Sequence, residues 1–250
     1  MSRRLALPLA LLVLVSASCG GSGSSSTKPV TITVGAAASL TAAFEDLGAA
    51  FTAANPNVSV KFSFGASSDV ARQIGEGAPI DVFASADAKN MDKVVASAGV
   101  SAEPAVFATN SLQIIVGAGN PKAIAGIDDL ARSDVLVVAC SPDVPIGKYT
   151  QQVLDAAGVT VKPVSLEENV KGIVSKVTIG EADAGVVYRT DVIAAGDAAV
   201  GVEIPANVNV TARYPIAALK GASAAARDFV AFVLSDAGRA VLQRFGFGAP

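Results

Sequence analysis

The sequence contains no histidine among its 250 residues. Histidine is the commonest general base near neutral pH and a frequent zinc ligand, so its absence excludes Ser-His-Asp and Cys-His catalysis and the usual zinc sites. The segment Gly65-Ala66-Ser67-Ser68-Asp69 superficially resembles a nucleophile elbow, but Asp69 stands where the second glycine belongs. The composition therefore disfavours a hydrolase.

Cysteine and nucleotide-binding motifs are also scarce. The chain has two cysteines, and only Cys140 lies in the expected mature fold, so no internal disulfide is expected. The apolar neighbours of Cys140 predict a small core residue. No Gly-x-x-x-x-Gly-Lys-Ser/Thr phosphate loop occurs, and Gly117-Ala118-Gly119 lacks the third glycine of a dinucleotide fingerprint. The 19 basic and 22 acidic residues form no basic stripe, so we expect no nucleic-acid partner.

The first 29 residues predict export rather than fold. Residues 1–18 have the basic start, short apolar run and small-residue end of a signal peptide, and the apolar run is too short to span a bilayer. Residues 19–29 resemble the lipid-anchored Gly/Ser tether of a bacterial lipoprotein, with Cys19 as the lipid anchor. Ser16 stands where the lipobox prefers an aliphatic residue, so plain secretory cleavage into the periplasm is the alternative. We expect a protein at the outer face of the cytoplasmic membrane, attached only through its lipid.

The rest of the chain alternates strand and helix patterns, which predicts an α/β fold with a largely parallel sheet. We expect strands at residues 31–34, 58–64, 80–84, 112–116, 135–139, 161–164, 184–188, 200–204 and 214–219. Helical patterns follow most of these strands, and Asp87 is expected to cap one of the helices.

Small residues and serines stand where the first two strands lead into helices. Ser39 is a preferred helix N-cap residue, and an apolar face begins at Leu40. Such a junction directs free N–H groups, the positive end of the helix dipole and a hydroxyl toward one point, which can hold a small anion. The alternative is that Ser39 only caps its own helix. The segment around Ser67 and Ser68 repeats the pattern.

Two later segments add further donors. Pro145 and Gly147 flank Ile146 in a loop that leads into a helix, so the Ile146 N–H could face a ligand, although the loop could equally be only a rigid turn. The strand at 184–188 delivers Tyr188 at its carboxyl end, where ligands bind in open α/β sheets. Neutral donors without an acceptor favour a fully deprotonated oxyanion and penalise protonated phosphate. Size would separate molybdate and tungstate from sulfate.

Several ordered motifs carry a resemblance to a known family. They include Gly35-Ala36-Ala37-Ala38-Ser39-Leu40, Phe64-Gly65-Ala66-Ser67-Ser68, Val144-Pro145-Ile146-Gly147-Lys148-Tyr149, Glu168-Asn169-Val170-Lys171-Gly172, Gly185-Val186-Val187-Tyr188 and Arg244-Phe245-Gly246-Phe247. Over residues 30–248 the chain resembles the periplasmic molybdate-binding proteins, which are the solute receptors of molybdate ABC importers.

This resemblance implies a type II periplasmic-binding-protein fold, in which two α/β lobes enclose a ligand cleft. Residues 30–109 and 214–250 would form lobe 1 and residues 110–213 lobe 2, with crossings near Asn110-Ser111 and Arg213-Pro215. The expected partners are molybdate or tungstate, an ABC permease and its ATPase, and the protein is expected to be a monomer.

The resemblance also implies a binding site. It places the ligand hydroxyls on Ser39, Ser67 and Tyr188 and the main-chain donors on Ile146 and Val170, with Ser68 as a neighbour of the site. No cofactor and no metal cation held by protein ligands are expected, because molybdenum would be bound only as its oxyanion.

The sequence is also compatible with two other functions. One is a binding protein for another tetrahedral oxyanion such as sulfate. The other is an enzyme that uses carboxylates, and the candidates are Asp81, Asp87, Asp143 and Glu168, although their spacing pairs no two of them. Arg72 and Lys148 could add charge near the site, but we favour solvated surface positions for both.

Overall fold

The computed structural model describes residues 28–250. The expected signal peptide, Cys19 and almost all of the tether lie outside these residues. Within the described part of the chain, no helix has both the length and the apolar character needed to cross a membrane.

Nine strands and eight α-helices make up the described chain. The strands are β1 (Val30–Ala37), β2 (Val58–Gly65), β3 (Val82–Ala84), β4 (Ala105–Gly117), β5 (Val137–Cys140), β6 (Ser165–Glu167), β7 (Ala184–Tyr188), β8 (Ala199–Glu203) and β9 (Thr211–Ala218). The helices are α1 (Thr41–Ala54), α2 (Ser67–Gly75), α3 (Ala88–Ser97), α4 (Pro145–Ala157), α5 (Val170–Thr178), α6 (Arg189–Ala195), α7 (Ala224–Leu234) and α8 (Asp236–Arg244). Short 3₁₀ helices span Ala38–Leu40, Ile127–Ala131 and Gly196–Ala198.

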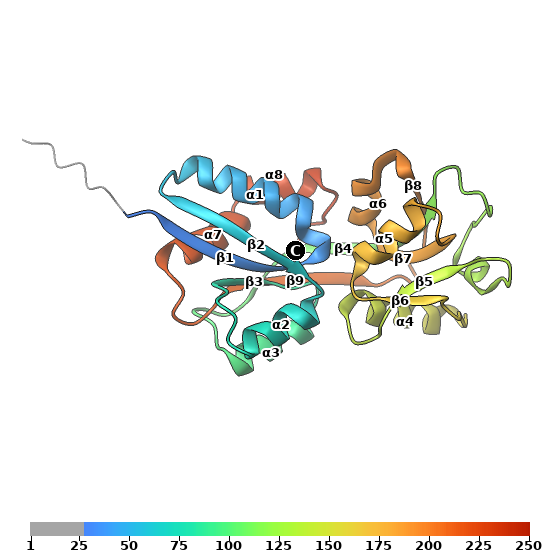
Figure 1. Ribbon diagram of the computed structural model, residues 1–250, viewed down its shortest axis with the longest axis horizontal. Helices are drawn as coiled ribbons and strands as arrows, with labels where there is room; N and C mark the ends of the chain where they lie inside the picture. The colour runs from blue at the N-terminus through green and yellow to red at the C-terminus, as the bar shows by residue number, and fades with distance from the viewer. Residues whose placement is uncertain (1–27) are drawn as a thin grey trace, which may run out of the picture.

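These elements form two α/β lobes that lie end to end (Figure 1). The first lobe contains β1–β3, α1–α3, α7 and α8, and the second contains β5–β8 and α4–α6. Strands β4 and β9 run side by side between them. The expected two-lobed α/β fold is therefore confirmed.

The expectation of a largely parallel sheet is wrong. The strand order is β2-β1-β3-β9-β4-β7-β5-β6, with β8 paired to β4. Parallel pairs occur within each lobe, β1 with β2 and β3, and β5 with β6 and β7. The joining strands are antiparallel to each other and to β3, β7 and β8. The sheet is mixed because its two central strands pass between the lobes in opposite directions.

Strand β4 changes partners at one point along its length. From Ala105 to Ser111 it pairs with β9, and from Leu112 onward it pairs with β7 and β8. Leu112 is opposite Tyr188 in this register. The last residue of β7 therefore lies where the chain passes from one lobe to the other.

The strand expected at 161–164 is also wrong. That stretch lacks strand structure, and β6 begins at Ser165. Pro163 has no N–H to donate to a neighbouring strand. Only Val164 reaches the sheet there, by donating its N–H to the Val137 carbonyl at 2.8 Å. Residues 162–164 are exposed, so the apolar pattern of this stretch indicated neither strand pairing nor burial correctly.

Aromatic rings fill the core of the first lobe. Phe229 of α7 contacts Phe51 edge to face at 5.3 Å between ring centroids, and it also contacts Phe44 and Phe62. Its side chain is fully buried. Because edge-to-face rings add to the free energy of burial, this cluster ties α1, β2 and α7 together.

Replacing Phe229 with alanine should remove this packing and lower the free energy of unfolding by about 3–5 kcal/mol. Urea denaturation of the residue 28–250 chain measures the change. Phe232, on the same helix but only partly buried, is the matched control, and Phe232→Ala should cost clearly less. Equal losses for the two variants would contradict the packing assigned to Phe229.

Candidate functional site

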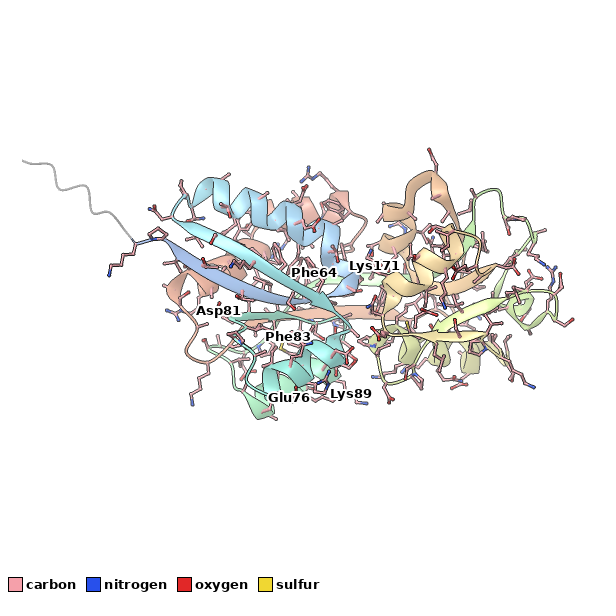
Figure 2. All side chains as sticks on the ribbon, in the orientation of Figure 1. Phe64, Glu76, Asp81, Phe83, Lys89 and Lys171 are labelled. Atoms are coloured by element: carbon pink, nitrogen blue, oxygen red, sulfur yellow. The ribbon has the colours of Figure 1, made fainter. Side chains whose placement is uncertain are left out.

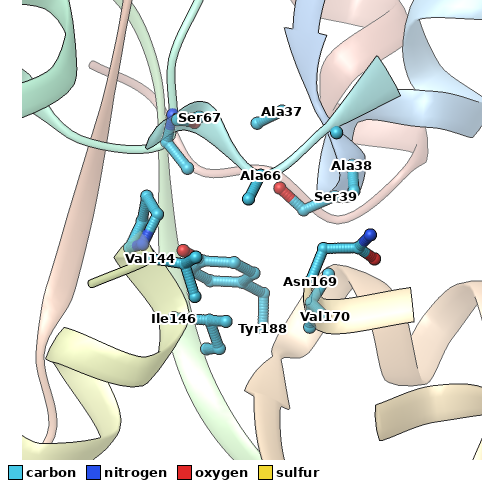
Figure 3. A pocket seen from close by; sticks show the side chains of 13 residues that line it. Ala37, Ala38, Ser39, Ala66, Ser67, Val144, Ile146, Asn169, Val170 and Tyr188 are labelled. Carbon is cyan, nitrogen blue, oxygen red and sulfur yellow. The ribbon is translucent and has the colours of Figure 1, made fainter. Parts of the chain in front are cut away.

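A small cavity lies between the two lobes (Figure 3). Its empty volume is about 240 Å³, smaller than the roughly 300–1,000 Å³ of sites for drug-sized ligands. It is lined by Ala37, Ala38, Ser39, Gly65, Ala66, Ser67, Ala86, Val144, Pro145, Ile146, Asn169, Val170 and Tyr188. All five residues expected to bind the ligand are in this set. The cavity suits a single small ion.

Ser39 lies in the 3₁₀ turn Ala38–Leu40 between β1 and α1. It is not the N-cap of α1, because the turn delays the helix to Thr41 and Leu40 takes the capping position without a side-chain hydrogen bond. The Ser39 Oγ lies instead 3.0 Å from the hydroxyl of Tyr214 on β9. The expectation that Ser39 caps its helix is therefore wrong, and its hydroxyl is available at the cavity.

Ser67 is the first residue of α2, and Ala66 alone separates it from β2. Its Oγ accepts a hydrogen bond from the Ala86 N–H at 3.0 Å. Because a hydroxyl has one proton and two lone pairs, the Ser67 proton stays free to be donated. Ser68 is half-buried and does not line the cavity.

The second lobe contributes two helix starts to the same cavity. Helix α4 begins at Pro145 and places Ile146 in its first turn, and α5 begins at Val170 after its N-cap Asn169. The first N–H groups of a helix have no partner within the helix, and the helix dipole favours negative charge beside them. Ile146 and Val170 therefore present main-chain donors together with a partial positive charge.

Gly147 allows the first turn of α4 to pack closely against the loop that precedes it. A Cβ at this position would collide with the carbonyls of Ser141 and Cys140 in the preceding loop. The close approach of the loop to the helix therefore requires glycine at this position.

Tyr188 supplies the third hydroxyl. Its side chain is almost fully buried, and its hydroxyl has no hydrogen-bond partner among residues 28–250. Burial raises the pKa of Tyr188 well above its ordinary value, so the phenol stays protonated. A buried hydroxyl without a partner costs free energy, so this group indicates a ligand that accepts its proton.

No charged side chain lines the cavity. Arg72 is exposed and pairs with Glu76 and Asp69 on the surface of α2, while the Lys148 ammonium lies 5.9 Å from the centre of the Tyr149 ring. Lys171 follows Val170 at the junction of the lobes (Figure 2), and its ammonium is held by buried Asp191 at 3.0 Å. The site consists of neutral donors.

None of the carboxylates considered for catalysis lines the cavity. Asp87 caps α3 by accepting from the Asn90 N–H at 2.9 Å, and Asp81 accepts from the Thr33 N–H at 2.7 Å. Among residues 28–250, no group of three or more Cys, Asp or Glu side chains could hold a metal ion. Cys140 is buried, and burial raises its pKa to about 12, which fits a core position.

Sequence reasoning missed two residues that support the site. Tyr214 contacts Ser39 from 175 positions away, and Tyr149 of α4 donates to the Ala86 carbonyl at 3.3 Å from 63 positions away. The sequence has three tyrosines, and the structure gathers all three around this cavity. Tyr149 ends one of the motifs that carry the family resemblance, and this was an available signal for it.

Comparison of the sequence with known proteins finds a matching family and several relatives. A family profile described as bacterial extracellular solute-binding protein matches residues 32–248. A molybdate-binding protein of Mycobacterium tuberculosis is 44% identical over 217 residues, which cover 86% of this chain and 83% of the relative.

Solved structures show the same fold. A periplasmic molybdate-binding protein of Azotobacter vinelandii matches with a TM-score of 0.76 at 23% identity, covering 88% of this chain and 99% of the other. A sulfate-binding protein of Mycobacterium tuberculosis matches with a TM-score of 0.74 at 22% identity, covering 87% and 86%. The two scores are nearly equal, so fold similarity alone does not distinguish the two ligands.

The burial of the three tyrosines predicts how stability depends on pH. Desolvation raises the pKa of Tyr149, Tyr188 and Tyr214 in the folded chain, while a tyrosine in an unfolded chain has a pKa of about 10. Above that pH the unfolded chain releases protons that the folded chain retains, so the free energy of unfolding should fall as pH rises.

Tyrosinate absorbance near its ultraviolet maximum, recorded with circular dichroism from pH 8 to 12, tests this expectation. Tyrosinate should appear together with loss of the folded signal. Ionisation of the tyrosines with a midpoint of about pH 10, while the chain is still folded, would contradict the burial of these phenols.

Proposed function

Because the chain belongs to the bacterial extracellular solute-binding proteins, and within them to the molybdate-binding proteins, we propose that it captures molybdate between its lobes and delivers it to an ABC importer. Tungstate, an anion of the same shape and charge, would bind the same site. The 44% identity to a molybdate-binding relative supports this ligand. The neutral donors of the cavity support a fully deprotonated oxyanion.

The unpartnered Tyr188 hydroxyl is the observation that carries the proposal. It is buried, protonated and located in a cavity without a charged side chain. An oxyanion oxygen would accept its proton and remove the cost of the unmade hydrogen bond. A purely apolar ligand would leave that cost in place, and a cation would meet only the lone pairs of the hydroxyl and not accept its proton.

We assign the donors as the hydroxyls of Ser39, Ser67 and Tyr188 and the N–H groups of Ile146 and Val170. The two serines belong to the first lobe, while Ile146, Val170 and Tyr188 belong to the second. An ion bound by all five would hold the lobes together, so its arrival would favour the closed arrangement.

The lobes would divide the chain as residues 30–109 with 214–250, and residues 110–213. The change of partners along β4 after Ser111 supports the first boundary. The second boundary falls within β9, which continues from its pairing with β4 into the first lobe.

Sulfate is the second candidate ligand, because a sulfate-binding protein has nearly the same fold. Sulfate is also a dianion without a proton at neutral pH, so donor chemistry alone does not reject it. The two ligands differ in size, and the small cavity would discriminate by fit. Sequence identity favours molybdate.

The family implies an exported protein that works with a permease and an ATPase. We propose that Cys19 carries the lipid, that residues 19–29 are the tether and that the receptor acts as a monomer at the outer face of the cytoplasmic membrane. The lipobox-like sequence before Cys19 supports the anchor, and Ser16 is its one departure from the usual pattern.

Thermal unfolding of the residue 28–250 chain with molybdate, tungstate, sulfate or phosphate tests the ligand. A ligand that binds only the folded state raises its stability by about 2.7 kcal/mol at a concentration 100 times its Kd. Molybdate and tungstate should raise the unfolding temperature strongly, and phosphate should not. Ser39→Ala, Ser67→Ala and Tyr188→Phe should each reduce the rise, because each removes one donor.

Ser68→Ala is the matched control, since Ser68 neighbours Ser67 but does not line the cavity. It should retain the full rise in unfolding temperature. A rise with sulfate alone would replace molybdate by sulfate as the ligand. No rise with any of the four anions would refute the proposed function.

A further inference from the structure

A chain of buried polar side chains runs from Ser39 across both joining strands. The Tyr214 hydroxyl lies 3.0 Å from Ser39 Oγ, and Asn110 Nδ2 lies 3.5 Å from that hydroxyl and 2.9 Å from Thr190 Oγ1. These four side chains are at most 7% exposed. Tyr214 comes from β9, Asn110 from β4 and Thr190 from α6. This row of hydrogen-bonded side chains therefore links a donor of the first lobe to the second lobe.

The amide of Asn110 sets the direction of this chain. Its Nδ2 can only donate, and its 3.5 Å contact makes the Tyr214 oxygen an acceptor, while Asn110 Oδ1 is buried without a partner among residues 28–250. By geometry either hydroxyl of the Tyr214–Ser39 pair could donate, and Ser39 Oγ is the acceptor within reach of the single Tyr214 proton. When Tyr214 donates, Ser39 Oγ accepts and its own proton remains for the cavity. A serine without this partner could turn either its proton or a lone pair toward the ligand.

We propose that Tyr214 is a positioning residue that makes Ser39 a hydrogen-bond donor to the bound oxyanion, with Asn110 fixing the direction. This inference rests on the proposed function. Tyr214 does not line the cavity, so it would act through Ser39 rather than by touching the ion.

The location of Tyr214 makes it rigid enough for this role. Its ring packs edge to face against Tyr188 at 5.8 Å and Phe247 at 5.5 Å between centroids, and its side chain is fully buried. On β9 it is opposite Ala108 of β4, two residues before Asn110. The hydroxyl that orients Ser39 is thus fixed to both strands that join the lobes.

The arrangement has a consequence for selectivity. A serine lone pair facing the cavity would repel a deprotonated oxyanion but would accept the proton of hydrogen phosphate or hydrogen arsenate. By holding the Ser39 proton toward the cavity, Tyr214 would favour molybdate over these protonated anions.

A double-mutant cycle tests whether Tyr214 acts through Ser39. Molybdate is titrated by calorimetry into the residue 28–250 chain and its Ser39→Ala, Tyr214→Phe and doubly substituted variants. Tyr214→Phe should weaken binding about 3- to 10-fold in the wild-type background and should have no further effect in the Ser39→Ala background. Equal weakening in both backgrounds would overturn the proposal.

Tyr149→Phe is the matched control. It removes another buried hydroxyl beside the cavity, but this hydroxyl donates to the Ala86 carbonyl and does not contact Ser39. Tyr149→Phe should change the Kd for molybdate by the same factor in the wild-type and Ser39→Ala backgrounds. A loss of that factor in the Ser39→Ala background would show that the cycle does not report the Ser39 contact, and it would overturn the assignment.

A second readout does not need the Ser39→Ala variant to bind. Competition between molybdate and hydrogen arsenate should show a smaller preference for molybdate in Tyr214→Phe than in wild type, while Ser68→Ala, outside the cavity lining, keeps the wild-type preference. An unchanged ratio in Tyr214→Phe would overturn the proposal. If Tyr214→Phe does not fold, Asn110→Leu is measured instead, because it keeps the tyrosine. It should show the same smaller preference for molybdate over hydrogen arsenate, and an unchanged preference would overturn the proposal.

These measurements separate this inference from the proposed function. A wild-type chain that binds sulfate and not molybdate refutes the proposed ligand, and the cycle is then run with sulfate. Coupling between Tyr214 and Ser39 in that cycle would support the role of Tyr214, and additivity would refute it.

Discussion

Removing a small dianion from water is the constraint on which the rest of this structure depends. A buried charge is very unfavourable unless every solvent contact is replaced by hydrogen bonds or by an opposite charge. No cationic side chain lines the cavity, so the replacement must come from neutral donors. Helix starts and hydroxyls are such donors, and four strand-to-helix junctions bring them to one place. The small residues and the glycine at these junctions allow the backbone to approach that closely.

Because the donors come from both lobes, the joining strands determine how they meet. Strands β4 and β9 form the antiparallel centre of the sheet, and Tyr188 ends β7 where β4 changes partners. The hydrogen bond from Tyr149 to the Ala86 carbonyl spans the lobes directly, and the N–H of the same residue donates to Ser67. In the proposed site, ligand binding and lobe closure would share these groups, which is how a receptor can make its loaded state distinct from its empty one.

Local sequence patterns predicted the parts of the structure that depend on neighbours in the chain. The alternation of strands and helices, the Asp87 cap and the core position of Cys140 are confirmed, because capping and amphipathic periodicity act over a few residues. The two-lobed fold came from the resemblance and is confirmed. The antiparallel joining strands, the 3₁₀ turn that displaces Ser39 from the helix cap, and the support from Tyr214 were not predicted. Each depends on contacts between distant segments, and Pro163, which has no N–H to donate, lies in the stretch 161–164 that was expected to be a strand.

The central claim is that neutral donors of both lobes hold a fully deprotonated oxyanion without a charged partner. A crystal structure of the residue 28–250 chain with molybdate tests this most directly. The account predicts molybdate oxygens within hydrogen-bonding distance of the Ser39, Ser67 and Tyr188 hydroxyls and the Ile146 and Val170 N–H groups, with no lysine or arginine in contact. An anion bound through Arg72, Lys148 or Lys171, or one contacted by a single lobe, would contradict it.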